Sequence, residues 1–245
     1  MKIGIIGSNG FLGKNLSIFL KKKNNVKNFS SYSDSKKKWL VTVCKEIKNY
    51  APDIIINCAA SQILDDDLKS IEKLIYSNLY SQSGFLDEAK KQKNFIGFIT
   101  FGSRWEYNQK GEYQPNSFYA ATKHASDYLL QYFVNKKITI VSLKIFDTYG
   151  KNDNRKKILN LLLKSYKNQT TLKLSPGKQE VDLVNILDIC ELVSIICTDI
   201  KKKKNTRLQK IYSKFKETYE INSVNKNFKK KFEKKFKCRN WGIGI

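Results

Sequence analysis

Short apolar runs alternate with longer amphipathic stretches along most of the chain. Residues 2–6 and 53–57 are mainly apolar, as expected of buried parallel strands. Residues 11–20 carry apolar side chains at helical spacing. This alternation predicts a parallel sheet with right-handed crossovers, and hence an α/β fold. Further strands are predicted at 26–30, 94–101, 138–146 and 180–185, and further helices at 39–50, 66–91, 119–135 and 155–168, with a last helix ending near 196.

The first predicted strand ends in a glycine-rich turn. Gly7, Gly10 and Gly13 follow at intervals of three residues, in G-S-N-G-F-L-G, and a helical pattern begins there. Glycines at this spacing permit a tight turn, close approach of the backbone to a phosphate, and close packing of helix on strand. The helix N-terminus then faces the anion. The strand before and the helix after are the context that such a motif requires. We therefore predict dinucleotide binding on a Rossmann-type, doubly wound parallel sheet.

Tyr119 and Lys123 lie four residues apart, in F-Y-A-A-T-K, so they share one face of the predicted helix. A phenol ordinarily titrates near ~10, too high for proton exchange at neutral pH. A nearby ammonium favours the phenolate, so we expect Lys123 to lower the pKa of Tyr119 and make it a general acid or base. The alternative is a surface Tyr and Lys on an amphipathic helix. The presence of the other motifs in the same chain favours the catalytic interpretation.

Several further residues stand at or just beyond the carboxyl end of a predicted strand. Ligands of open parallel sheets gather at that edge. We therefore expect these scattered positions to form a single site. They are Gly7, Ser30, Asn57, Ser103 and Phe146.

Five motifs, in this order, resemble those of the extended short-chain dehydrogenase/reductases (the NAD-dependent epimerase/dehydratase family), which act mainly on nucleotide-linked sugars. The resemblance covers roughly residues 1 to 195, including a segment at 175–188 like the family's substrate side. Within the family, the chain looks most like the 4-keto reductases of deoxysugar nucleotides, of the CDP-abequose and CDP-paratose synthase type. The motifs are G-S-N-G-F-L-G at 7–13, N-C-A-A at 57–60, F-I-T-F-G-S at 98–103, Y-A-A-T-K at 119–123 and F-D-T-Y-G at 146–150.

The resemblance implies a Ser-Tyr-Lys mechanism. Tyr119 would exchange the proton on a sugar oxygen, Ser103 would hydrogen-bond that oxygen, and Lys123 would also hold the nicotinamide ribose. Arg104 and Asp147 are expected to bind the substrate. Other interpretations stay open for three positions, because Ser103 could be a turn former, Asn57 a strand-end cap and Asn78 a helix cap. The residues expected to bind the cofactor are Gly7, Ser8, Asn9, Gly10, Phe11, Leu12, Gly13, Ser30, Asn57, Ala59, Ala60, Asn78, Lys123 and Phe146.

Departures from the family's pattern narrow the reaction. Dehydratases of the family carry an Asp-Glu pair beside the serine position, where this chain has Arg104 and Trp105, so dehydration is not expected. The favoured reaction is NAD(P)-dependent reduction of a 4-keto (deoxy)sugar nucleotide, and 4-epimerisation with tightly bound NAD is the alternative. Val181 stands where the family often has arginine, and the chain is shorter than most members. A second alternative is therefore a non-catalytic dinucleotide-binding relative with an incomplete substrate pocket.

The end of the second predicted strand bears on the choice of cofactor. Ser30 and Ser31 occupy the positions where NAD-specific members usually have an acidic residue, and lysines follow at 36–38. These side chains suit a 2′-phosphate better than a diol, so we expect NADP(H) in preference to NAD(H). Asp34 keeps NAD as the alternative.

The composition changes once, near Lys201. Residues 201–245 hold 16 Lys or Arg against 3 Glu, a net charge of +13 out of +24 for the whole chain. We assign residues 1–170 to the Rossmann domain and 171–245 to a small, partial substrate-binding lobe with a basic tail. The tail could attract polyanions, but Phe228, Phe232 and Phe236 at helical spacing favour packing over base stacking. We expect at most weak, salt-sensitive binding of nucleic acid.

Other site classes and compartments are less consistent with the sequence. The single histidine, His124, argues against a Ser-His-Asp triad elsewhere and against a His-rich metal site, so no metal is expected. Five cysteines without C-x-x-C spacing favour free thiols and a cytoplasmic location. No apolar run is long enough for a membrane span, and the N-terminus is a strand rather than a signal peptide. The expected partner is a nucleotide-sugar substrate, and the expected assembly a homodimer.

Overall fold

A computed structural model describes residues 1–32, 35–65, 67–108, 110–134, 138–174, 180–202, 208–212 and 219–220. They belong to two compact units, the first comprising Met1–Ile145 and Ile186–Ser213, and the second Phe146–Asn185 and Lys214–Ile245. The residues of the predicted tail helix, Asp34 and Cys238 lie outside the described residues. The assignment of residues 171–245 to a substrate-binding lobe stays a prediction.

The first unit is built on a six-stranded sheet with the order β2-β1-β3-β4-β5-β9, in which every neighbouring pair is parallel. β2 and β3 flank β1, so the order of the strands reverses at the boundary between β1 and β3. Ligands of doubly wound sheets bind beyond the carboxyl ends of the strands at such a point. The strands are β1 (Lys2–Ile6), β2 (Asn25–Asn28), β3 (Ile54–Asn57), β4 (Gly97–Ser103), β5 (Thr139–Ile145) and β9 (Leu208–Tyr212).

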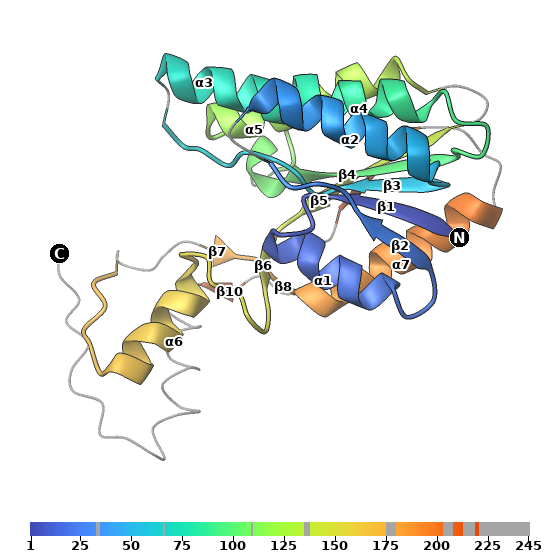
Figure 1. Ribbon diagram of the computed structural model, residues 1–245. Coiled ribbons are helices and arrows are strands. Elements are labelled where there is room, and N and C mark those ends of the chain that lie inside the picture. The colour runs from blue at the N-terminus through green and yellow to red at the C-terminus, as the bar shows by residue number, and fades with distance from the viewer. Residues whose placement is uncertain are drawn as a thin grey trace. The chain divides into compact units, whose positions relative to one another are not determined.

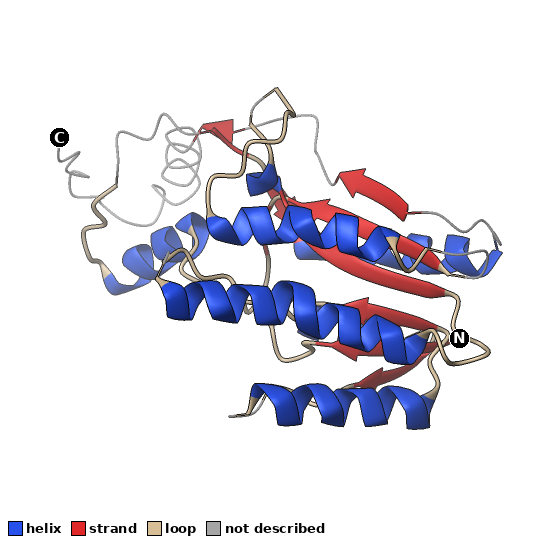
Figure 2. Ribbon diagram, turned by 90° about the horizontal axis from the view of Figure 1, so that it is seen from above, coloured by secondary structure: helices blue, strands red, loops and turns tan. Residues whose placement is uncertain are grey.

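Helices cover both faces of this sheet, which confirms the predicted doubly wound α/β fold (Figure 1). One face carries α1 (Phe11–Leu20) and α7 (Ile186–Lys202), and the helices lie roughly along the strands (Figure 2). The helix predicted at 66–91 forms as two α-helices joined by a π-helical turn at Tyr76–Tyr80. The opposite face carries α2 (Lys36–Tyr50), α3 (Leu68–Ile75), α4 (Ser81–Ala89) and α5 (Phe118–Gln131).

The core explains why these segments form these elements. Ile54, Ile55 and Ile56 of β3 are all fully buried, because both faces of the strand lie under helices. In α2, Trp39, Val43 and Ile47 recur every four residues and form the buried stripe of an otherwise polar helix. None of the described helices has both the length and the apolar character that crossing a membrane would need.

The described residues of the second unit form two short sheets and one helix. β6 (Asp147–Tyr149) pairs in parallel with β8 (Leu183–Asn185), and β7 (Glu180–Val181) pairs antiparallel with β10 (Tyr219–Glu220). The strand predicted at 180–185 is therefore divided between two sheets. α6 (Ile158–Asn168) starts three residues later than predicted.

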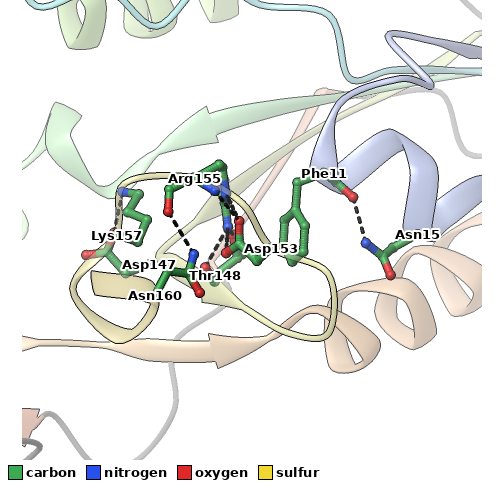
Figure 3. Close-up of polar contacts among 8 residues, drawn as sticks. All are labelled: Phe11, Asn15, Asp147, Thr148, Asp153, Arg155, Lys157 and Asn160. Atoms are coloured by element: carbon green, nitrogen blue, oxygen red, sulfur yellow. Dashed lines mark hydrogen bonds and ion pairs between the residues drawn. The ribbon is translucent and has the colours of Figure 1, made fainter. Parts of the chain in front are cut away.

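Arg155 anchors the loop between β6 and α6. Its Nε and Nη2 each lie 2.8 Å from an oxygen of Asp153, and Nη2 also donates to the carbonyl of Thr148 at 2.7 Å (Figure 3). Asn160 donates to the Arg155 carbonyl at 2.9 Å, so the start of α6 is tied to the same loop.

Candidate active site

The glycine-rich turn has the geometry that its sequence predicts. Gly7 has a φ of +77°, and a Cβ added there would lie 2.6 Å from the Ala59 nitrogen. A Cβ on Gly13 would collide with the Gly7 carbonyl group. Gly10, the N-cap of α1, differs because its added Cβ would meet only the Gly7 oxygen, at an ordinary 3.5 Å. Gly7 and Gly13 are therefore required by the fold, whereas the open space at Gly10 fits a phosphate at the helix N-terminus.

These differences predict opposite phenotypes for two alanine variants. Gly13→Ala should lower the free energy of unfolding by about 1–3 kcal/mol, the usual effect of overpacking. Gly10→Ala should stay within about 1 kcal/mol of the wild type and weaken dinucleotide binding by about tenfold or more, because the methyl group would occupy the phosphate's approach. Urea unfolding and fluorescence titration with NADH and NADPH measure both effects. An unchanged affinity in Gly10→Ala would contradict phosphate binding at this turn.

The rest of the turn and the end of β2 form one rim of the site. Ser8 is buried, and the exposed Asn9 donates from Nδ2 to Ser31 Oγ at 2.6 Å. Ser30 binds the Glu46 carboxylate, through its nitrogen at 2.7 Å and its hydroxyl at 2.9 Å. A cofactor contact at Ser30 stays a prediction, and Glu46 is an acidic neighbour that the sequence pattern did not reveal.

Asn57 closes β3 from inside the protein. Its Oδ1 accepts a hydrogen bond from the Ala59 nitrogen at 3.2 Å, which orients the backbone ahead of the exposed Ala60. Its Nδ2 donates to Gln82 Oε1 at 3.1 Å, and Thr100 of β4 donates to the same oxygen at 2.6 Å. The contacts are those of the strand-end cap that the sequence left open.

Asn78 lies in the π-helical turn and joins three parts of the site. Its Oδ1 accepts a hydrogen bond from the Ser61 nitrogen at 3.1 Å, and its Nδ2 donates to the Ser61 carbonyl at 3.2 Å. Nδ2 also donates to Thr122 Oγ1 of α5 at 3.0 Å. One turn further along, Gln82 Nε2 donates to Ser126 Oγ at 2.5 Å. Both pairs are spaced by four residues, so they form a matched seam between the helices. Asn78 therefore fixes the position of the helix that carries Tyr119.

Ser103 ends β4 and begins a 3₁₀ turn, Arg104–Glu106. Its Oγ accepts a hydrogen bond from the Trp105 nitrogen at 3.2 Å, and its own nitrogen donates to Glu106 Oε1 at 2.7 Å, which makes a capping box. The turn-forming role is thus real. A hydroxyl that accepts one hydrogen bond can still donate its own proton, so the same position can serve a substrate oxygen. Arg104 donates to the Tyr107 carbonyl close by.

Tyr119 and Lys123 are 9 % and 7 % exposed on α5. Trp105 packs edge-on against the Tyr119 ring, with 6.2 Å between centroids. Burial, and then the charge of Glu106, raises the pKa of Tyr119 to about 12. The expected lowering by Lys123 is therefore wrong for this structure, because removal from water and the negative charge of Glu106 determine the pKa of Tyr119. Burial lowers the pKa of Lys123 itself to about 8, against the opposing effect of Glu106.

The chain is similar to known proteins over most of its length. The model of the family described as "NAD dependent epimerase/dehydratase family" matches residues 3–212. The chain belongs to this family of enzymes. The CDP-abequose synthase of Yersinia pseudotuberculosis is 29 % identical over 225 residues, which is 87 % of this chain and 79 % of that protein. The resemblance predicted from the motifs is thereby confirmed.

Solved structures show the same fold at lower identity. A UDP-glucuronic acid 4-epimerase from Bacillus cereus, in complex with UDP-glucuronic acid and NAD, superposes with a TM-score of 0.80 at 20 % identity, over 100 % of this chain and 87 % of that one. A dTDP-4-dehydrorhamnose reductase from Clostridium acetobutylicum gives 0.74 at 19 % identity, over 94 % and 80 %. The chain spans about half (49 %) of a dTDP-glucose 4,6-dehydratase from Xanthomonas campestris, at 21 % identity.

Two predicted site residues of this family member, Phe146 and Asp147, belong to the second unit. The Asp147 carboxylate pairs with Lys157 Nζ at 2.7 Å (Figure 3). Their roles toward cofactor and substrate stay predictions, as does that of Arg104.

The sequence interpretation missed a group of buried charges beneath Ser103 and Tyr119. Lys144 of β5 lies 2.6 Å from Glu106 Oε2 and 2.8 Å from Asp127 Oδ2 of α5. Two signals were present in the sequence. Glu106 stands three residues after Ser103, the spacing of a capping box, and Lys144 interrupts an apolar strand, where an ammonium needs a partner.

Proposed function

We propose that the chain is an NAD(P)-dependent oxidoreductase that reduces a 4-keto (deoxy)sugar nucleotide with Ser103, Tyr119 and Lys123. The observation that carries the proposal is the surroundings of Glu106. Its carboxylate holds the Ser103 nitrogen and acts on the pKa of both Tyr119 and Lys123. Ser103 ends β4, and Tyr119 and Lys123 lie on α5, where the Tyr119 ring packs against Trp105, two residues after Ser103. The CDP-abequose synthase relative supports the substrate class.

The raised pKa of Tyr119 keeps this residue in the protonated form that reduction requires. Reduction of a ketone adds a hydride to the carbon and a proton to the oxygen, so the protein must present an acid. With its pKa near 12, Tyr119 keeps its proton throughout the neutral range and is present as the acid that reduction needs. The same pKa makes it a weak acid, so efficient transfer to the carbonyl oxygen requires a lower pKa once cofactor and substrate are bound. Ser103 donates a hydrogen bond to the same oxygen and orients it.

The α1 turn and Lys123 are the cofactor side of the proposal. A nicotinamide dinucleotide, when bound, supplies the hydride. The backbone of Gly7–Gly13 would hold its diphosphate at the N-terminus of α1, and Lys123, four residues from Tyr119, would hold the ribose. With a pKa near 8, Lys123 is mostly charged at neutral pH and is the more readily deprotonated of the two groups.

Dehydration is disfavoured by the contacts of the 3₁₀ turn. Arg104 binds the Tyr107 carbonyl and Trp105 packs on Tyr119, and neither side chain is an acid or base at neutral pH. Glu106 is fully buried and held by Lys144, so it is not available to exchange protons with a substrate.

The preference for NADP(H) over NAD(H) stays a prediction, and its support changes. Lys36, one of the three lysines expected near a 2′-phosphate, pairs with Glu72 at 2.7 Å. The Glu46 carboxylate beside Ser30 is negatively charged and would repel the negative charge of a 2′-phosphate there. Ser31 and the exposed Lys37 and Lys38 are the side chains that still favour the phosphate. Both cofactors therefore belong in the test.

The deciding experiment offers the purified full chain a set of nucleoside diphosphate 4-keto-6-deoxysugars with either NADPH or NADH. We expect oxidation of the reduced cofactor to depend on one of these sugars and to yield its 4-hydroxy product. Interconversion of 4-epimers by the protein as purified, with NAD that resists dialysis, would show the epimerase instead. Tight cofactor binding without turnover of any sugar nucleotide would favour the non-catalytic relative.

A further inference from the structure

The ion cluster beneath the proposed catalytic residues joins three elements of the first unit. Lys144 of β5 contacts Glu106 of the 3₁₀ turn and Asp127 of α5, at 2.6 and 2.8 Å. The side chains of Lys144 and Glu106 are fully buried, and that of Asp127 is 1 % exposed. Charges at such depth are costly unless they pair closely, so the cluster constrains the elements it connects.

The cluster reaches the proposed catalytic residues from both sides. On one side, Glu106 Oε1, the oxygen that does not contact Lys144, accepts a hydrogen bond from the Ser103 nitrogen at 2.7 Å. On the other, Asp127 lies four residues after Lys123 and eight after Tyr119, on the same side of α5. A continuous path of polar contacts therefore runs from Ser103 through Glu106, Lys144 and Asp127 into the helix that carries the other two residues.

Gly102 shows that the backbone is adapted to this cluster. A Cβ added at Gly102 would lie 2.5 Å from Lys144 Nζ and 2.6 Å from Glu106 Oε1. Only a residue without a side chain leaves room for the ammonium and the carboxylate to meet beneath Ser103.

We propose that Lys144 is a positioning residue, which holds Ser103 in register with Tyr119 and Lys123 through Glu106 on one side and Asp127 on the other. This inference rests on the proposed function. It assigns no proton transfer to Lys144, Glu106 or Asp127, which act through their neighbours.

The charged groups of the cluster shift the pKa of Lys123 in opposite directions. Burial lowers the pKa of Lys123 most. Glu106, Cys58 and Asp127 raise this pKa, and Lys144 lowers it further. Loss of the Glu106 charge should therefore lower the pKa of Lys123, and loss of the Lys144 charge should raise it.

His124 is the further titratable group that faces Glu106. Its Nδ1 lies 3.2 Å from Glu106 Oε2, and its ring stacks on Tyr113 at 3.9 Å between centroids. Tyr107 and Tyr128 pack against the same ring at 5.7 and 5.5 Å.

The test compares Lys144→Met, Lys144→Arg and Glu106→Gln with Lys91→Met, which removes an ion-paired lysine from the surface. Turnover of the sugar nucleotide found in the screen gives kcat and KM. In Lys144→Met and Glu106→Gln we expect kcat to fall by about 10–100-fold, the effect of small misplacements, with KM and cofactor Kd within about threefold. Lys144→Arg should recover most of kcat, and Lys91→Met should match the wild type.

Titration of Lys123 supplies a readout that needs no turnover. In protein labelled with ¹³C at lysine Cε, the Lys123 resonance is identified as the one that disappears in Lys123→Met, and we expect it to titrate below the range of a lysine in water. We expect its midpoint to move to lower pH in Glu106→Gln and to higher pH in Lys144→Met. If these shifts occur while no sugar nucleotide is reduced, the cluster acts as inferred and the proposed function fails.

Equal Lys123 midpoints in all variants, shifts of the same sign, or an unchanged kcat in both Lys144→Met and Glu106→Gln would overturn the inference. If Lys144→Met does not fold, Glu106→Gln and Lys144→Arg decide alone. Glutamine keeps the size of glutamate, and its amide oxygen can still accept the Ser103 nitrogen. A Glu106→Gln variant with wild-type kcat and an unmoved Lys123 midpoint would then be sufficient refutation.

Discussion

Replacement of Tyr119 by phenylalanine should reduce kcat by about 10²–10⁴-fold, the usual contribution of a general acid. The variant removes only the phenolic oxygen, and the ring keeps its edge-on contact with Trp105. Cofactor affinity and the midpoint of thermal unfolding should therefore stay close to the wild-type values. Turnover, fluorescence titration of the cofactor and a thermal scan measure these quantities on one preparation.

Tyr132→Phe is the matched control for this variant. Tyr132 caps the C-terminal end of α5 and is 81 % exposed, so its hydroxyl lies on the same helix but outside the site. We expect its kcat to equal that of the wild type. A Tyr119→Phe variant that retains kcat within about threefold would rule out Tyr119 as the proton donor, whatever the substrate.

The fold could be predicted because its signals are local. The apolar run of β3 follows from burial on both faces of the strand. The spacing of Trp39, Val43 and Ile47 at every fourth residue follows from burial of one face of α2. The glycine-rich turn could also be predicted, because steric contacts with only a few neighbouring residues require glycine at positions 7 and 13. The π-helical turn could not be predicted, because the contacts of Asn78 that accompany it come from Ser61 and Thr122, far away in sequence.

The electrostatics of the site escaped prediction for the same reason. The sequence displays Lys123 one turn from Tyr119, and that spacing alone indicates a lowered phenol pKa. In the structure, burial and the Glu106 carboxylate, which come from packing and from another element, reverse the direction. Lys36 is a parallel case, because Glu72, distant in sequence, takes the ammonium that seemed placed for a phosphate.

The buried ammonium of Lys123 should make the protein less stable than it could be. Its pKa in the folded protein is about 8, below the value of 10.5 for a lysine in water. Between these values the unfolded chain binds more protons than the folded one, so stability rises with pH in this window. Below about pH 8 the full penalty applies, and above about pH 10.5 it vanishes.

We therefore expect Lys123→Met to be more stable than the wild type at pH 7, by on the order of 3 kcal/mol. Methionine retains the apolar stem and carries no charge to bury. The gain should shrink as the pH rises through 8 toward 10.5, and urea unfolding at pH 7 and pH 10 measures both values. Turnover should be lost together with the charge, the exchange of stability for function common at active sites.

Lys91→Met provides the comparison for this measurement. Lys91 is an exposed lysine whose pKa is raised by its hydrogen bond to Glu88, so its removal relieves no penalty of burial. We expect no stabilisation at either pH. If Lys123→Met were instead less stable than the wild type at pH 7, Lys123 would be a stabilising partner of the Glu106 carboxylate. That result would contradict a lowered pKa for Lys123. A lysine whose charge stabilises the folded protein has a pKa above its value in water.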